Sequence, residues 1–459
     1  MIENELVEFE NNSKVLEYKY TYKNIPIWPY IRDLLIRRAC LDKYGITSIN
    51  HHKIRNDKYR HYIKYNPFNL GKKDILFFTQ SNLMAEENGQ IFDRLIDDFI
   101  KLDVNNSAKI INCTDNLDFR KLSETSITFS TNTFLQQIIK HEGERLRISN
   151  IEINIIEDFI DYIKHNIPFY VEEGVYGAIR EVAIKTIKEF PACYKYYSKL
   201  VDIIQPKIII CHCGIYGLPQ VRVFNDCGVI TAEYQHASIY FHFDYMYGKK
   251  IAENTEYKKC VPKYLLTWGD YWTCNKNLPT NIFKIGNPTV QKNIDKFNNM
   301  KLDIDDSFNI LILVGDRHEW CIKFIYYILE NLPSDFRIIL KLHPLQPYTA
   351  KYYEPFYMNE RVSIVSKGFV YKYFAMCKYI VGDTSTSVYE AAAVGKKVFI
   401  IDNEYTRGYL SNNFGIWIKN GQEFIEKMDK NINNQLSKKD FFEDSWEQNY
   451  LRFLQKVVY

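Results

Sequence analysis

The sequence predicts an α/β protein in which two Rossmann-like domains face each other across a cleft. Patterns typical of buried strands alternate with patterns typical of amphipathic helices, in two series that join near residues 270–285. Such alternation favours parallel sheets that are covered by helices on both faces. The length agrees, because 459 residues correspond to two or three domains at roughly 150 residues each.

Residues 1–70 are predicted to form an N-terminal helical extension that is rich in aromatic and basic residues. Segment 25–38 mixes apolar and arginine positions at helical spacing after Pro29. Two interpretations remain open: the helix docks on its own domain, which is the simpler case, or it lies at an interface with the acceptor or a membrane. No apolar run approaches the roughly 18 residues that a spanning helix needs, so a membrane-linked substrate would be reached from the surface.

The first series predicts an acceptor-side domain over residues 71–272. Apolar runs of strand length alternate in it with patterns of helical period. The predicted strands are 73–79, 108–113, 207–213, 229–235 and 263–269. The predicted helices are 91–102, a long stretch over 150–204, and 219–228.

The second series predicts a nucleotide-donor domain over residues 273–435, followed at 436–459 by an aromatic helix that packs back on one of the domains. The predicted strands are 281–286, 308–315, 336–343, 362–366, 378–381 and 397–401. The predicted helices are 318–332 and a segment that ends at Gly395.

Composition excludes some classes of protein. A net charge of +3 gives no case for a nucleic-acid partner. The ten cysteines form no spacing framework, and the acidic start has no signal-peptide pattern, so we expect a reducing, cytoplasmic setting.

A run of hydroxyl residues marks the first candidate site. In an open α/β sheet, ligands bind outside the carboxyl ends of the strands. The predicted strand 378–381 ends there, and a helix follows the hydroxyl run. Helix N-termini attract anions, so we expect the hydroxyls to hold a phosphate. For Ser387 a capping box with Glu390 is an equally good reading, and Glu390 has the alternative of reaching a ribose hydroxyl. The run consists of Thr384, Ser385, Thr386 and Ser387.

Two further strand ends carry polar groups. Lys341 and His343 share one face of a strand that exits at Pro344, and such a pair can neutralise a diphosphate or protonate a departing phosphate oxygen. Gly315 permits close backbone approach, and Arg317 can pair with phosphate, whereas Asp316 is expected to cap a helix. The predicted donor-binding residues are Gly315, Arg317, Lys341, His343, Pro344, Asp383, Thr384, Ser385, Thr386, Ser387 and Glu390.

In the first domain, Glu233, Gln235 and His236 come directly off a strand. An acceptor hydroxyl needs a base and an anomeric carbon needs a carboxylate partner, and Glu233 or His236 supplies either. The predicted catalytic residues are therefore Glu233, His236 and His343. His212 lies between Cys211 and Cys213, but no second cysteine pair at zinc spacing accompanies it, so no metal site is predicted.

On these residues, the chain over roughly 70–430 resembles a GT-B glycosyltransferase of bacterial surface-polysaccharide assembly. Segment 341–344 (KLHP) is similar to the HP motif of sialyl-, polysialyl- and Kdo-transferases, and 384–387 resembles their Ser/Thr motif. The layout, with the GNP turn 286–288 and His236, is also similar to CDP-glycerol glycerophosphotransferases, in which the first-domain histidine is the proposed base. Ala237 stands where related chains often have glycine, and no acidic sialyltransferase motif is present.

The resemblance implies a metal-independent transfer without a cofactor, from a cytidine nucleotide donor to an oligosaccharide or lipid-linked acceptor. The leading hypothesis is transfer of Kdo or a nonulosonic acid from CMP to a surface glycan. We expect the protein to act in the cytoplasm, where it can also contact the inner face of the membrane peripherally. The alternatives are a UDP- or GDP-sugar donor, a CDP-polyol phosphate, a nucleotide-sugar epimerase, and a non-enzymatic carbohydrate-binding subunit.

Overall fold

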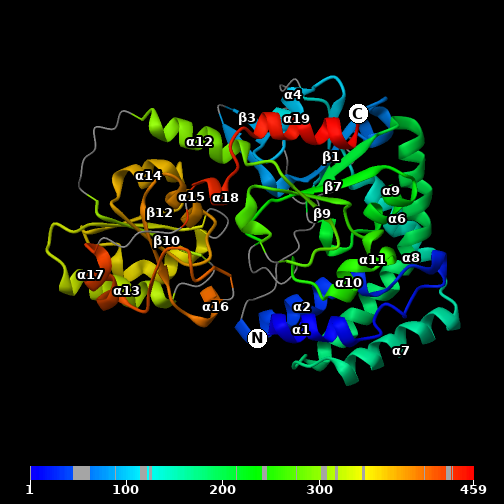
Figure 1. Ribbon diagram of the computed structural model, residues 1–459, viewed down its shortest axis with the longest axis horizontal. Coiled ribbons are helices and arrows are strands. Elements are labelled where there is room, and N and C mark those ends of the chain that lie inside the picture. The colour runs from blue at the N-terminus through cyan, green and yellow to red at the C-terminus, as the bar shows by residue number, and fades with distance from the viewer. Residues whose placement is uncertain are drawn as a thin grey trace.

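The computed structural model describes residues 2–44, 63–87, 89–113, 121–122, 127–212, 214–239, 245–274, 276–300, 308–315, 319–343, 347–407, 409–430, 436 and 438–459. Two parallel sheets, each with helices packed around it, form two lobes (Figure 1). Arg317, Pro344 and the expected cap Asp316 lie outside the described residues.

Within the described ranges, the sheet of the first lobe has seven strands in the order β5-β4-β1-β6-β7-β8-β9. All neighbouring pairs are parallel. The strands are β1 (Ile75–Gln80), β4 (Ser107–Asn112), β5 (Phe129–Thr131), β6 (Ile208–Cys211), β7 (Ile230–Tyr234), β8 (Tyr264–Thr267) and β9 (Asn281–Lys284). Central strands such as β6 are buried along their whole length, as expected where helices cover both faces.

The sheet of the second lobe has six strands among the described residues, in the order β12-β11-β10-β13-β14-β15. Counted along the chain, this order is 3-2-1-4-5-6, the Rossmann order, and the first sheet begins with the same order. The predicted fold class, α/β with two Rossmann-like sheets of the GT-B type, is therefore confirmed. The strands are β10 (Ile310–Leu313), β11 (Ile338–Lys341), β12 (Val362–Val365), β13 (Tyr379–Gly382), β14 (Lys397–Ile401) and β15 (Ile416–Ile418).

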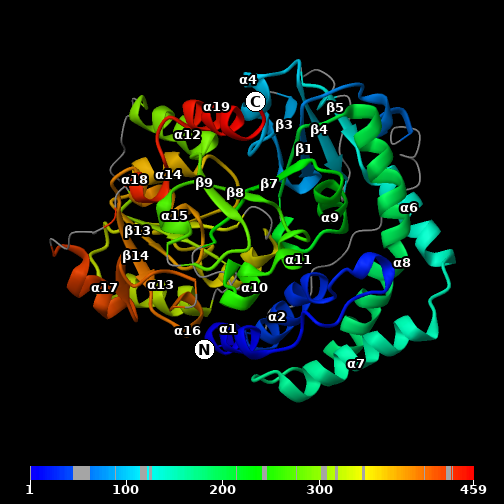
Figure 2. The same ribbon diagram turned by 45° about the vertical axis from the view of Figure 1, so that its right-hand side comes forward.

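Helices pack on both sheets (Figures 1 and 2). The α-helices of the first lobe are α1 (Ile2–Asn12), α2 (Trp28–Tyr44), α4 (Asp97–Leu102), α6 (Thr133–Arg145), α7 (Asn150–Asn166), α8 (Glu173–Ile204), α9 (Pro219–Asp226), α10 (Lys249–Glu253) and α11 (Thr255–Lys258). Those that follow are α12 (Pro288–Asn298), α13 (Glu319–Asn331), α14 (Val370–Met376), α15 (Ser387–Ala393), α16 (Glu404–Arg407), α17 (Gly421–Met428), α18 (Lys438–Phe441) and α19 (Trp446–Val457).

Three sequence predictions need correction. The strand at 281–286, which was expected to open the second series, is β9, and it pairs with β8 at the edge of the first sheet. The helix predicted over 91–102 is instead β3 (Gln90–Asp93), antiparallel to β2 (Met84–Glu87), followed by the short α4. The carboxylate of Asp93 accepts the Leu95 N–H at 2.8 Å and turns the chain between them. The long helix at 150–204 is two helices, α7 and α8.

The N-terminal helices are docked on the first lobe. Glu10 of α1 and Arg32 of α2 form a buried ion pair at 2.6 Å, and the second Glu10 oxygen accepts the Gly248 N–H at 2.8 Å. Trp28 and Ile31 are fully buried. Of the two interpretations of segment 25–38, docking on its own domain is confirmed.

The C-terminal helix returns to the first lobe after the second sheet is complete, as predicted. Trp446 packs edge-on against Phe99 of α4, with ring centroids 5.3 Å apart, and Phe453 packs on Phe283 of β9 at 5.2 Å. Figure 2 shows α19 beside α4, with α12 next to it. Just before it, Phe441 of α18 contacts Tyr389 of α15 at 5.2 Å, so this segment joins the two lobes.

Candidate functional site

Three neighbouring strands of the second sheet end together at the point where the strand order reverses. Leu313 of β10 pairs with Lys341 of β11 on one side and with Gly382 of β13 on the other. Because the strands are parallel, their carboxyl ends lie at one edge of the sheet. The structure therefore brings together the loop at Gly315, the Lys341–His343 segment and the hydroxyl run, as the sequence predicts for a ligand crevice.

Gly315 and Asp383 shape this edge from inside. A Cβ on Gly315 would lie 2.2 Å from Asp383 Oδ1, so only glycine fits beside that carboxylate. Asp383 is 1% exposed. Its Oδ1 accepts the Thr384 N–H at 2.6 Å, and its Oδ2 accepts the Trp320 indole N–H at 3.3 Å. The sequence predicts that Gly315 permits a close approach to its backbone. The group that lies close to it is the Asp383 carboxylate, which also holds the loop that starts at Thr384.

The hydroxyl run lies on the surface of this edge. Ser385, Thr386 and Ser387 are half-buried, and α15 begins at Ser387 with Thr386 as its N-cap. The Thr386 side chain makes no capping hydrogen bond to the helix. A capping box formed by Ser387 and Glu390 would require Ser387 to be the N-cap. Ser387 is instead the first helical residue, so the predicted capping box is wrong.

Glu390 interacts with Tyr371 of α14 and with Arg94 of the first lobe. Burial raises the pKa of its carboxyl, while the Tyr371 hydroxyl and the charge of Arg94 act to lower it. Arg94 follows β3 in the first lobe. Glu390 therefore takes part in an electrostatic contact between the lobes, and its role toward a ribose remains a prediction.

The amine of Lys341 is turned inward. Lys341 is 6% exposed, and its Nζ donates to the backbone carbonyl of Leu342 at 3.0 Å and to that of Ser366 at 3.1 Å. Burial lowers the pKa of this amine. His343, two residues on, is exposed, so its ring is more accessible to a phosphate than the Lys341 amine is.

In the first lobe, Glu233 and His236, the two predicted alternatives for the base, differ in their exposure. Glu233 is 1% exposed, and its carboxylate accepts the Ile215 N–H at 2.7 Å and the Tyr245 hydroxyl. It ties the segment after β6 to β7. His236 is half-buried at the carboxyl end of β7, so of the two side chains it is the one that a ligand can reach.

The loop that carries His236 is held by two side chains. Gln235 is fully buried; its amide donates to Ala237 O at 2.9 Å, and its carbonyl accepts the Trp268 N–H at 3.0 Å. Lys276, which sequence reasoning missed, donates to Ile239 O. Burial lowers the pKa of this amine to about 7. A lysine far along the sequence gives no local signal of this contact.

His212 lies at the end of β6, beside the first sheet's own point of strand reversal. It is 4% exposed, and its Nδ1 lies 3.3 Å from the Tyr234 carbonyl oxygen. The rings of His212 and His236 are edge-on, with centroids 6.2 Å apart. Among the described residues, no group of three or more metal-ligating side chains gathers here or elsewhere.

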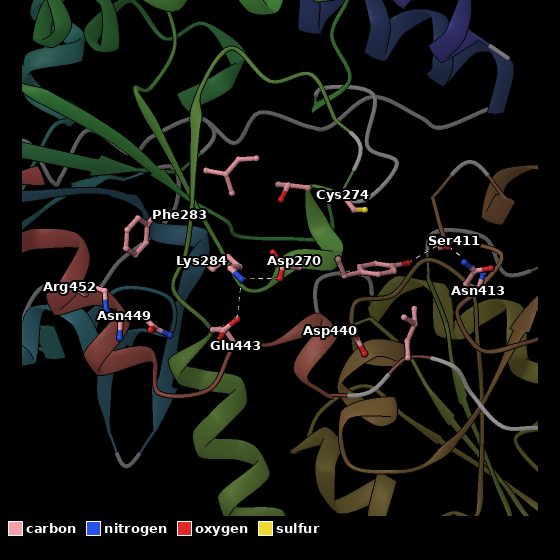
Figure 3. Close-up of a pocket in the computed structure, with 14 residues that line it drawn as sticks. Asp270, Cys274, Phe283, Lys284, Ser411, Asn413, Asp440, Glu443, Asn449 and Arg452 are labelled. Carbon is pink, nitrogen blue, oxygen red and sulfur yellow. Dashed lines mark hydrogen bonds and ion pairs between the residues drawn. The ribbon is translucent and has the colours of Figure 1, made fainter. Parts of the chain in front are cut away.

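A separate cavity of about 850 Å³ lies where the β9 edge, α18 and α19 meet loop 411–413 of the second lobe (Figure 3). Lys284 crosses it to Asp270 at 2.9 Å and to Glu443 at 4.0 Å. The charge of that lysine is thus already balanced by carboxylates. The predicted site residues do not line this cavity.

No helix in the described part of the chain is long and apolar enough to cross a membrane.

The chain was compared with protein families, curated proteins and solved structures. No family model matches, and no curated protein matches. UDP-GlcNAc 2-epimerase from Methanocaldococcus jannaschii is 14% identical over 83% of this chain and 99% of its own, with a TM-score of 0.44. The Neisseria meningitidis UDP-GlcNAc 2-epimerase bound to UDP-GlcNAc is 10% identical over 83% and 99%, with a TM-score of 0.46. MurG from Acinetobacter baumannii is 10% identical over 84% of this chain and 99% of its own, with a TM-score of 0.43. Likeness at this level assigns neither a family nor an activity.

Proposed function

We propose that this protein is a metal-independent glycosyltransferase of the GT-B type that takes a nucleotide-activated sugar as donor. The observation that carries the proposal is the common edge of β11, β10 and β13, where Leu313 pairs with both Lys341 and Gly382. Half-buried hydroxyls and an exposed histidine converge on that edge, and the Asp383 carboxylate is held inside it by hydrogen bonds from Trp320 and Thr384. Neutral donors and a histidine at a Rossmann switch point suit a phosphate.

In the proposed reaction, the edges of the two sheets have different roles. In the second lobe, Ser385, Thr386 and His343 hold the nucleotide phosphate as it leaves, and the neighbouring Lys341 amine contributes positive potential from beneath. In the first lobe, His236 takes the proton from the acceptor hydroxyl. The acceptor oxygen then forms its bond to the anomeric carbon, the bond from that carbon to the phosphate breaks, and its electron pair leaves with the nucleotide.

For the donor we propose a CMP-linked 2-keto acid sugar such as Kdo or a nonulosonic acid, and for the acceptor a growing surface glycan that is free or lipid-linked. This rests on the HP-like segment at 341–344 and the Ser/Thr-like run at 384–387. The reaction is proposed to take place in the cytoplasm, at the inner face of the membrane when the acceptor is lipid-linked.

A nucleotide panel tests the donor. A ligand that binds only the native state stabilises it by about 2.7 kcal/mol when present at 100 times its Kd. We expect CMP to raise the thermal midpoint of the pure protein, with smaller shifts for UMP, UDP and GDP. A shift with UDP or GDP alone would replace the cytidine donor by the runner-up, and the absence of a shift with every nucleotide would overturn the proposal. Turnover of the donor without an acceptor would identify an epimerase instead.

A further inference from the structure

A small basic cavity of about 280 Å³ lies at the amino ends of β8 and β9, on the edge of the first sheet that is opposite to His236. Three of its lining residues are lysines, Lys258, Lys259 and Lys263. None of the residues that line it in the described part of the chain carries a carboxylate. A cavity lined by charges of one sign attracts ions of the other sign, so this cavity is suited to an anion.

The positive charge of the cavity is only partly balanced by its surroundings. The Nζ atom of Lys259 lies 2.8 Å from the Glu256 carboxylate. Glu256 also lies 3.7 Å from the Arg222 guanidinium, so its charge is shared between two cations. Lys258 and Lys263 form no ion pair among the described residues. The cavity therefore has an excess of positive charge.

The backbone that carries the lysines is held by side chains of neighbouring elements. The Asn225 amide donates to the carbonyls of Lys259 and Val261, at 2.9 and 3.0 Å. The Thr231 hydroxyl accepts the Lys263 N–H at 2.9 Å and donates to Asn225 Oδ1 at 2.7 Å. Because this segment is fixed without a ligand, binding an anion requires mainly the ordering of side chains, which lowers its entropic cost.

The wall that precedes β9 contributes a hydroxyl group. Thr280 lines the cavity, and its Oγ1 atom is buried without a hydrogen-bond partner in the described structure. A buried hydroxyl without a partner is unfavourable. Rotation about the Cα–Cβ bond of Thr280 can turn this hydroxyl to an acceptor in the cavity, and an anion with several oxygen atoms supplies one.

The volume of the cavity limits the size of the anion. A water molecule takes about 30 Å³ in the liquid, whereas pockets for drug-sized ligands measure about 300–1,000 Å³. A cavity of about 280 Å³ thus has room for one phosphate group and a few waters. Lysine ammonium groups bind phosphate as point charges, which agrees with a site built from lysines and a hydroxyl.

We propose that this cavity binds the phosphate group of a small phosphate monoester or of a phospholipid head group, through Lys258, Lys263 and Thr280. The site is separate from the proposed catalytic edge, because the four residues of β8 place roughly 13 Å between the two ends of the strand. The inference does not rest on the proposed function.

The chain offers matched variants. The double variant Lys258→Gln, Lys263→Gln removes two charges from the cavity and keeps polar side chains. The control is Lys185→Gln, Lys199→Gln on α8, which removes the same charge from exposed positions of the same lobe. Thr280→Val removes the hydroxyl, and we expect its thermal midpoint to be unchanged or higher, because the hydroxyl has no partner.

The first readout is calorimetric titration of the full-length protein with inorganic phosphate at low ionic strength, where screening is weak. We expect the double variant of the cavity to bind at least tenfold more weakly than the wild type, and Thr280→Val two- to tenfold more weakly. The control should stay within twofold. Phosphate at the proposed site of the second lobe contributes equally to every variant. Absence of phosphate binding, or equal affinities of the double variant and the control, would overturn the proposal.

The second readout distinguishes the two sources of the phosphate group. The protein is titrated with glycerol 3-phosphate and floated with phosphatidylcholine vesicles that contain or lack phosphatidic acid. Binding of glycerol 3-phosphate that is lost in the double variant supports a soluble ligand. Flotation that needs phosphatidic acid and is lost in the double variant supports a head group. Flotation and binding that both persist in the double variant would contradict the site. If CMP causes no thermal shift, the proposed function fails, but the phosphate titration still decides this inference.

Discussion

The two sheets share a strand order but present different chemistry at the corresponding edges. At the reversal point of the second sheet, Ser385 and Thr386 are half-buried hydroxyls, and the carboxylate of Asp383 is held inside. At the reversal point of the first sheet, His212 and Glu233 are buried, whereas His236 is partly accessible. One edge suits an anion and the other suits a proton transfer, so the fold supplies the geometry while the loops supply the function.

The largest effect on the rate of transfer is expected at His236, to which the comparison of the two edges assigns proton transfer. His236→Ala should reduce transfer by about 10²–10⁴-fold, the usual contribution of a general base. The thermal shift caused by the nucleotide should be unchanged, since the proposed phosphate site lies in the other lobe. Steady-state kinetics together with thermal melts check both parts.

Glu233→Gln is the control for that variant, because Glu233 comes off the same strand. Both its oxygens accept from donors, and an amide cannot accept from both. We therefore expect a loss of stability of about 1–3 kcal/mol and no loss of kcat in the protein that remains folded. A folded Glu233→Gln that is inactive, beside an active His236→Ala, would reverse the assignment of the base.

A smaller effect is expected at the anion edge. Replacing Ser385 and Thr386 together by alanine removes two donors worth about 0.5–1.5 kcal/mol each. Nucleotide affinity, measured by calorimetry, should fall roughly five- to a hundredfold. The melting temperature of the free protein should stay the same, since the Thr386 hydroxyl caps no helix. Thr289→Ala, at a hydroxyl that donates to Arg94 O, is a matched control that should leave the affinity unchanged.

The smallest effect concerns Lys276, whose pKa in the folded protein is lowered to about 7 from 10.5. Between these values the unfolded chain binds more protons than the folded one, so stability rises with pH. The cost of burying the amine is therefore greatest below pH 7 and disappears toward pH 10. Lys276→Met should stabilise the protein most near pH 6, with a gain that shrinks as pH rises in urea unfolding curves. A gain independent of pH would show that the amine is charged throughout.

The sequence predicted the local elements of both edges well. The run at 308–315 and the strand, hydroxyl run and helix at 378–395 could be read because each depends on neighbours in the chain. The sheet to which 281–284 belongs could not, since strand pairing is not a local property. The helical spacing of apolar residues in 91–102 led to a wrong prediction of a helix, because the pairing of β3 with β2 outweighs the helical periodicity.

Within the site, the residue types were predictable but their orientations were not. Lys341 turns to Ser366 O, and Asp383 turns to Trp320. Both partners are distant in the sequence, so no spacing rule indicates them. His212 was considered only as a metal ligand, because its relation to His236 appears only when β6 and β7 lie side by side.

The most direct test of the division between the two edges is hydrogen–deuterium exchange with and without CMP. The account predicts that CMP protects the backbone amides of 383–388 and 341–343, and leaves those around His212 and 233–236 unchanged. Protection confined to the first lobe, or to the cavity at Asp270 and Lys284, would contradict it.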